Sequence, residues 1–117
     1  MPNVIVVPET EAFTNHVSHE NVVWITSKLG TPKLKENDAT YIAPYWLHGT
    51  KGVNRIYYIV KFKPGNEAAT FVLGNSFVVP KCWTEMGQHR RFEYHALSKF
   101  GYVEICPGLL TPTHGQF

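Results

Sequence analysis

Aspartate is scarce in this chain: Asp38 is the single one among nine acidic residues. Metal-dependent nuclease sites are built from clustered carboxylates, so the sequence argues against them. The nine glycines are spread over turns and form no phosphate-cradling loop, which argues against P-loop NTPases and dinucleotide-binding enzymes. Glycosidase chemistry needs two carboxylates close together, and Glu85 with Glu93 is a pair that no motif supports.

Cysteine is also rare, with Cys82 and Cys106 as the only two. We therefore expect reduced thiols and a cytoplasmic protein. Residues 1–13 lack the charged start, long apolar run and small-residue cleavage site of a secretory signal peptide. No apolar stretch approaches the roughly 20 residues that span a bilayer, so we expect no membrane partner.

The 117 residues that are present predict one domain, covering residues 1–117. Hydrophobic residues make up 44% of the chain and aromatic residues 14%, which is enough apolar material for a core without a metal or a disulfide. We accordingly expect no cofactor. The net charge of +2 is mildly basic, which permits a polyanionic partner without requiring one.

The first third of the chain predicts a strand, a helix and a second strand. The β-branched run at 3–7 stops at Pro8, and the second strand covers 21–26. A polar loop with Gly and Pro follows at 27–38. Between the strands, four residues at helical spacing predict the helix: Ala12, Phe13, His16 and Val17.

The stretch "YIAPYWLHGTKGVNRIYYIVKF" is the most aromatic part of the sequence. Residues 39–46 and 55–62 predict two antiparallel strands joined by about eight residues. Period-two alternation in the second strand predicts one core face, with Ile56, Tyr58, Val60 and Phe62. The opposite face, available for contacts, would carry Arg55, Tyr57, Ile59 and Lys61.

The second half of the chain predicts a hairpin, a helix and a last strand. Gly74-Asn75 separates two β-rich runs, which predicts a tight hairpin over 69–80. The spacing of Phe92, Ala96 and Phe100 predicts a helix over 89–100 that ends at Gly101. A strand at 102–106 is followed by a tail.

These elements predict an α+β fold: a bent, mostly antiparallel sheet or partly open barrel with two flanking helices. The segment "LKENDATYIAPYWLHGTKGVNRIYYIVKF" resembles PUA-like domains of the ASCH and EVE type, and "FVLGNSFVVPKCW" is similar to the hairpin that follows in them. The positions that carry the resemblance are Asp38, Tyr41, Tyr45, Ile56, Ile59 and Val60.

The resemblance implies a non-enzymatic module that holds RNA, DNA or a modified base, with the base in an aromatic pocket. The rings expected to line it are Trp24, Tyr45, Trp46 and Trp83, with Tyr57 on the contact face. Lys81, Arg90 and Arg91 lie near Trp83 in sequence and would meet phosphates, and Arg55 shares the face of Tyr57. A place in the hydrophobic core is the alternative for each Trp, because aromatic residues dominate small cores.

Two other functional classes stay open. Exposed rings near residues 45–48 would suit a protein-interaction or self-association patch, which would make a homodimer. A small enzyme could instead use Cys82 as nucleophile and His89 or His95 as base, with Glu85 or Glu93 orienting the imidazole.

A metal site is the weaker interpretation of the histidines. His16 and His19 are three residues apart on the predicted helix, with Glu20 beside them. Such a pair without a paired cysteine motif is more typical of a polar surface, so we expect no bound metal.

Overall fold

The computed structural model describes residues 3–8, 22–26, 39–46, 51–63, 68–85 and 93–113. Almost all of this backbone is extended, in keeping with its many β-branched and aromatic residues. The elements are β1 (Asn3–Val7), β2 (Val22–Thr26), β3 (Tyr41–Pro44), β4 (Val53–Lys63), β5 (Ala68–Trp83), β6 (Glu93–Ala96), the 3-10 turn η4 (Leu97–Phe100), β7 (Tyr102–Cys106) and β8 (Leu109–Pro112).

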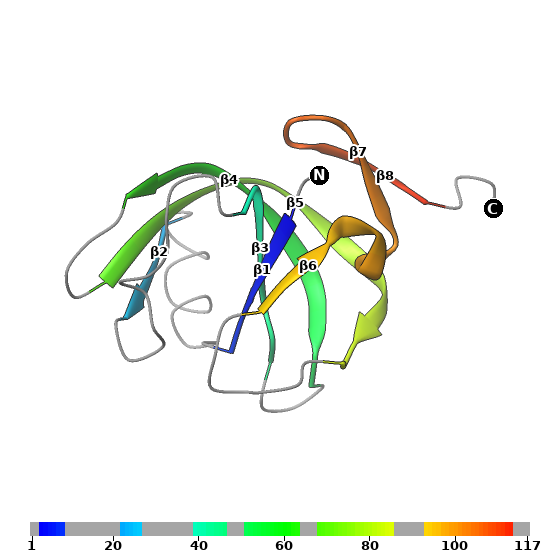
Figure 1. The fold of residues 1–117 in the computed structure, drawn as a ribbon, viewed down its shortest axis with the longest axis horizontal. Helices are drawn as coiled ribbons and strands as arrows, with labels where there is room; N and C mark the ends of the chain where they lie inside the picture. Colours follow the sequence, from blue (N-terminus) through cyan, green and yellow to red (C-terminus); the bar gives the residue numbers. More distant parts are fainter. Residues whose placement is uncertain are drawn as a thin grey trace.

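Within the described ranges, the strands form a six-stranded sheet in the order β2-β5-β4-β3-β1-β6 and a two-stranded β7–β8 hairpin. The β1–β3 pair is parallel, and the other paired strands are antiparallel. Figure 1 shows β4 and β5 as the longest strands, both strongly curved, with the hairpin standing off the sheet near the C-terminal end. The sheet is therefore mixed.

The expected α+β class with two flanking helices is wrong for the described part of the chain, where no residue is in an α-helix. Residues 93–96 of the predicted second helix form β6, because their backbone pairs with β1. Leu97 and Phe100 are buried from a single 3-10 turn, whose three-residue period explains their spacing. Gly101 ends that turn in the left-handed conformation, with φ 85°. The helix predicted at 12–17 lies outside the described residues.

Several strand predictions are confirmed: β1, β2, the antiparallel β3–β4 pair and β7. The hairpin at 69–80 is wrong, because β5 runs unbroken from Ala68 to Trp83. Gly74 and Asn75 instead fill an irregularity between the pairs Ile59–Leu73 and Tyr57–Ser76. The predicted tail also contains a strand, β8.

Glycine is required at position 74 because there is no room for a side chain there, and not because the chain turns. A Cβ at this position would lie 2.8 Å from Val60 Cγ2 and 3.3 Å from the ring of Tyr58. A Gly-Asn dipeptide is thus used here to let two curved strands approach closely.

The two faces of the central strands are both packed. Val4 and Val6 of β1 face one core, whereas Ile5 and Val7 face the other. The first core comprises Val4, Val6, Tyr41, Ala43, Tyr45, Val53, Ile56, Val79, Trp83, Leu97, Phe100, Tyr102 and Leu110. The second core comprises Ile5, Val7, Ile42, Phe71 and Leu73.

The side of the sheet to which the side chains of β4 point does not alternate regularly along the strand. Ile56 and Tyr58 pack on the first core as predicted. Val60, predicted to be buried, is 59% exposed, and Phe62 packs on the second core. Register shifts between Tyr57 and Ile59 and between Ile59 and Lys61 break the alternation. A bulge reverses which side chains face inward, so the predicted core face is wrong beyond Tyr58.

The β7–β8 hairpin is attached to the sheet through Tyr41. The buried Tyr41 hydroxyl donates to Glu104 Oε2 over 2.8 Å and accepts from the Gly108 amide over 3.1 Å. Asn75 Nδ2 donates to the Gly108 carbonyl over 3.0 Å, and the Tyr102 hydroxyl donates to the carbonyl of Val78. Polar side chains therefore hold the hairpin at both ends.

Stability should fall as the pH rises above about 10. Burial, reinforced by the hydrogen bond to Glu104, raises the pKa of Tyr41 above its ordinary value of 10.0. The unfolded chain then loses this proton at lower pH than the folded chain, so the stabilisation is complete below pH 10.0 and is lost above it. Urea unfolding at neutral pH and at several alkaline pH values measures the slope, which Tyr41→Phe should reduce. A flat profile would contradict the buried, neutral hydroxyl.

Candidate functional site

A pocket of about 300 Å³ lies where β4 extends past the start of β3. Pairing between these strands covers Tyr41–Tyr58 and Ile42–Tyr57, and the Ile59 amide donates to the carbonyl of Thr40 over 2.9 Å. Beyond this point β4 continues to Lys63 beside β5. The seven residues that line the pocket are Ala39, Thr40, Tyr58, Ile59, Val60, Lys61 and Phe62.

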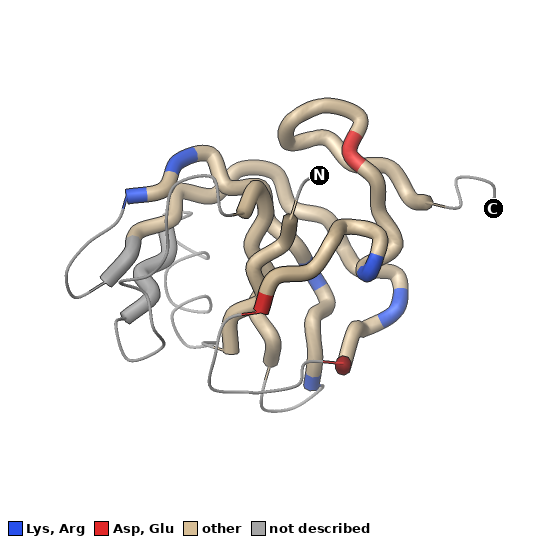
Figure 2. Tube along the Cα trace, viewed as in Figure 1, with Lys and Arg blue, Asp and Glu red and all other residues tan. Residues whose placement is uncertain are grey.

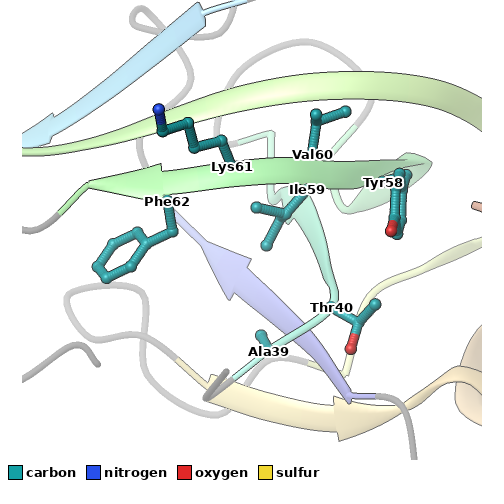
Figure 3. A pocket seen from close by; sticks show the side chains of 7 residues that line it. All are labelled: Ala39, Thr40, Tyr58, Ile59, Val60, Lys61 and Phe62. Atoms are coloured by element: carbon teal, nitrogen blue, oxygen red, sulfur yellow. The ribbon is translucent and has the colours of Figure 1, made fainter. Parts of the chain in front are cut away.

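The bulge in β4 determines which side chains enter this pocket region from the strand. Figure 3 shows Ile59 and Phe62 on the side of β4 that faces Ala39, and Val60 and Lys61 on the other side. Phe62 rests against Phe71, with ring centroids 5.0 Å apart and planes inclined by 44°. Because Phe62 is only half-buried, part of its side chain is accessible to a ligand.

The described residues around the pocket carry positive charge. Among the described residues of its lining, Lys61 is the one that is charged, and Lys63 follows at the end of β4, both exposed. Figure 2 shows basic positions at this end of the sheet, and no acidic position is coloured on the described trace beside them. The end of β4 thus presents a half-buried ring on one side of the strand and an exposed lysine, Lys61, on the other.

Tyr45 and Trp83, two of the rings predicted to line a pocket, meet in the first core instead. Their centroids are 6.3 Å apart at 86°, and they are only 3% and 5% exposed. The Tyr45 hydroxyl donates to the carbonyl of Thr84 over 3.2 Å. Trp83 also packs on His95 at 4.7 Å and on Phe100 at 5.1 Å. Neither ring offers a face for stacking.

Of the residues predicted to contact a ligand, Tyr57 and Trp46 pack on the same core, and Arg55 lies near Tyr57. Tyr57 is half-buried against the second core, and its burial raises its pKa while Arg55 opposes the shift. Arg55 Nη1 donates to Ser76 Oγ on β5 over 2.8 Å. Trp46 packs on the same core and its Nε1 donates to Asn54 Oδ1 over 3.2 Å.

Of the other predicted residues whose side chains are described, Lys81 does not line this pocket. Lys81 is exposed on β5. Trp24 lies in β2 opposite Thr70, and only its backbone is described. Arg90 and Arg91 lie outside the described residues. Phe62 and Thr40 were missed, because the alternation placed Phe62 in the core and no pattern in the sequence marked the bulge.

Of the groups of the enzymatic alternative, His95 and Glu93 are brought together as that alternative expected, whereas Cys82 has a backbone partner. Cys82 Sγ donates to the carbonyl of Lys51 over 3.1 Å. His95 Nε2 lies 3.0 Å from Glu93 Oε1. His89 is outside the described residues. In the ranges that are described, no group of three or more His, Cys, Asp or Glu residues could hold a metal ion; the pair His16 and His19 lies outside these ranges.

In comparisons with models of protein families, with curated proteins and with solved structures, nothing matches this chain. The resemblance to PUA-like domains therefore remains a prediction. Among the residues that the structure describes, there is no helix whose length and apolar character would let it cross a lipid bilayer.

Proposed function

We propose that this chain is a non-enzymatic binding module that takes a nucleobase of single-stranded RNA or DNA, or a modified base, at the end of β4. The observation that carries the proposal is the pocket beside Phe62 with Lys61 in its lining and Lys63 next to it. The proposal keeps the ligand class expected from the sequence. It moves the site from Tyr45 and Trp83, which are buried, to the overhanging part of β4.

A half-buried ring at a small pocket suits a flat ligand. A base stacked on an aromatic side chain gains about 1–3 kcal/mol, whatever the base, because every base has a π-face. The volume of about 300 Å³ is at the lower end for ligand pockets, so one base rather than a long segment would enter it. Tyr58 and Ile59 supply apolar walls, and Thr40 supplies a hydroxyl.

The lysines would give the binding its salt dependence. Lys61 and Lys63 are exposed and belong to one strand. Because Lys61 points away from Phe62, a phosphate chain would meet it after passing from the Phe62 side around the end of β4. Arg55, further along β4, uses Nη1 on Ser76 and retains other donors for a phosphate. With reduced thiols and a nucleic-acid ligand, we place the protein in the cytoplasm.

Phe62→Leu should weaken binding of a labelled single-stranded oligonucleotide about fivefold to 100-fold, the equivalent of one lost stack. Leucine retains an apolar side chain against Phe71, so the fold should survive. The matched control is Phe77→Leu, since Phe77 is a half-buried ring packed on the first core beside Tyr102. Fluorescence anisotropy with RNA and DNA of the same sequence measures both variants.

The same titration over a salt series tests the lysines. Lys61→Ala and Lys63→Ala should each lower the slope of log affinity against log salt by about one. Lys99→Ala, an exposed lysine in η4, should leave it unchanged. Absence of oligonucleotide binding, or binding that ignores both salt and Phe62, would contradict the proposed function.

A further inference from the structure

The ring of Tyr58 lines the pocket and also lies against the turn of the β7–β8 hairpin. Figure 3 shows this ring pointing from β4 to the side on which Thr40 lies. A Cβ on Gly108, in the hairpin turn, would lie 3.1 Å from Tyr58 Cδ2 and 3.3 Å from Cε2. A contact of 3.1 Å is tighter than nine in ten Cβ contacts in proteins, so the turn rests on the ring because residue 108 has no side chain.

Gly108 is held in place by hydrogen bonds from the sheet to both of its polar groups. Its amide donates to the Tyr41 hydroxyl over 3.1 Å, and its carbonyl accepts from Asn75 Nδ2 over 3.0 Å. Its φ of 83° lies in the left-handed region, which glycine adopts without steric cost. The hairpin turn is therefore a fixed support for the Tyr58 ring.

The Tyr58 ring is also bounded by the neighbouring strands. A Cβ on Gly74 would lie 3.3 Å from Tyr58 Cδ2, and Tyr41 packs on the ring with centroids 5.5 Å apart. Close-packed interiors transmit a displacement because they contain few voids that absorb it. The pocket is the open space beside the ring, so a group added at Gly108 would move the ring towards the ligand.

We infer that the hairpin turn is part of the ligand site: Gly108 sets the position of Tyr58 and thereby the size of the base that the pocket accepts. This assignment rests on the proposed function, since it concerns the same pocket. In a volume of about 300 Å³, a wall that moves inward penalises a purine more than a pyrimidine, because a purine has two fused rings. Gly108 acts through Tyr58 and is therefore a positioning residue.

A comparison of Gly108→Ala with Gly101→Ala tests the inference. Gly101 has nearly the same φ, 85°, but among the described residues its added Cβ would come closest to Pro80 Cδ, at 3.9 Å. Both variants carry the same backbone strain, and only Gly108→Ala presses on Tyr58. Fluorescence anisotropy with labelled oligoadenylate and oligocytidylate gives the ratio of the two affinities, from which the folded fraction of each variant cancels.

Gly108→Ala should lower the ratio of oligoadenylate affinity to oligocytidylate affinity at least about fivefold, and Gly101→Ala should leave it at the wild-type value. If the alanine variants do not fold, Gly108→Asn and Gly101→Asn give the same comparison, because Asn adopts a positive φ more readily. An unchanged ratio in the variant at 108, or an equal change in the variant at 101, would overturn the inference and leave the proposed function standing. Absence of oligonucleotide binding by the wild type would overturn both.

Discussion

Replacement of Trp83 by alanine is expected to lower the free energy of unfolding by about 3–5 kcal/mol. Trp83 is 5% exposed and its ring packs against Tyr45, His95 and Phe100. Alanine would leave a cavity among these rings that the surrounding strands fill only in part. A loss of this size is a large fraction of the ~5–15 kcal/mol that stabilises a typical domain. Chemical denaturation followed by far-UV circular dichroism measures it.

Trp83→Phe separates the lost volume from the indole N–H. The buried Trp83 Nε1 has no hydrogen-bond partner among the described residues, and an unsatisfied buried donor costs about 1–3 kcal/mol. Phenylalanine removes that donor and keeps an aromatic ring, so this variant should be clearly more stable than Trp83→Ala. If Trp83→Ala instead unfolded like the wild type and only lost oligonucleotide affinity, the ring would belong to a ligand site rather than to the core.

Tyr41→Phe is expected to cost about 1–3 kcal/mol and to loosen the β7–β8 hairpin. The substitution keeps the buried ring but leaves the Gly108 amide without its acceptor and the Glu104 carboxylate without its donor. The hydrogen bond to a carboxylate is of the stronger, charge-assisted kind. Amide hydrogen exchange should quicken in the hairpin more than in β4, because the remaining attachments of the hairpin are fewer.

A double-mutant cycle with Glu104→Gln isolates the Tyr41–Glu104 contact. The two changes should not be additive, since either one removes the same hydrogen bond, and the coupling is expected at roughly 0.5–3 kcal/mol. Phe100→Leu, a change in the same core without a polar contact to Glu104, serves as the matched comparison. Strict additivity of Tyr41→Phe with Glu104→Gln would show that the hydroxyl does not hold the hairpin.

Local patterns predicted the strands β1 and β2 well. The runs at 3–7 and 22–26 are rich in Val and Ile, and β-branched side chains fit an extended backbone in most surroundings. The predicted helix over 89–100 failed because Leu97 and Phe100 have a spacing that both an α-helix and a 3-10 turn satisfy. Residues 93–96 are a strand because they pair with β1, which lies at the other end of the chain. A pattern within residues 89–100 carries no information about so distant a partner.

The predicted site was limited by the same non-local effects. Tyr45 and Trp46 are adjacent in the sequence, but Tyr45 packs in the first core and Trp46 packs against the second. Composition alone could therefore not predict which of the two rings is accessible to a ligand. Phe62 was assigned to the core face because alternation was extended through a bulge. Beside the bulge, a Cβ on Gly74 would lie 2.8 Å from Val60 on the neighbouring strand, and local alternation within β4 contains no information about that neighbour.

The position of β1 between β3 and β6 affects the order in which the fold can be completed. A ribosome delivers β1 first, but one of its two partners, β6, is synthesised only after β2 to β5. Until Glu93–Ala96 emerge, one edge of β1 has unpaired amides and carbonyls beside apolar side chains. Nascent chains stalled between β5 and β6 should therefore bind chaperones or aggregate, and release from that state should coincide with the appearance of β6.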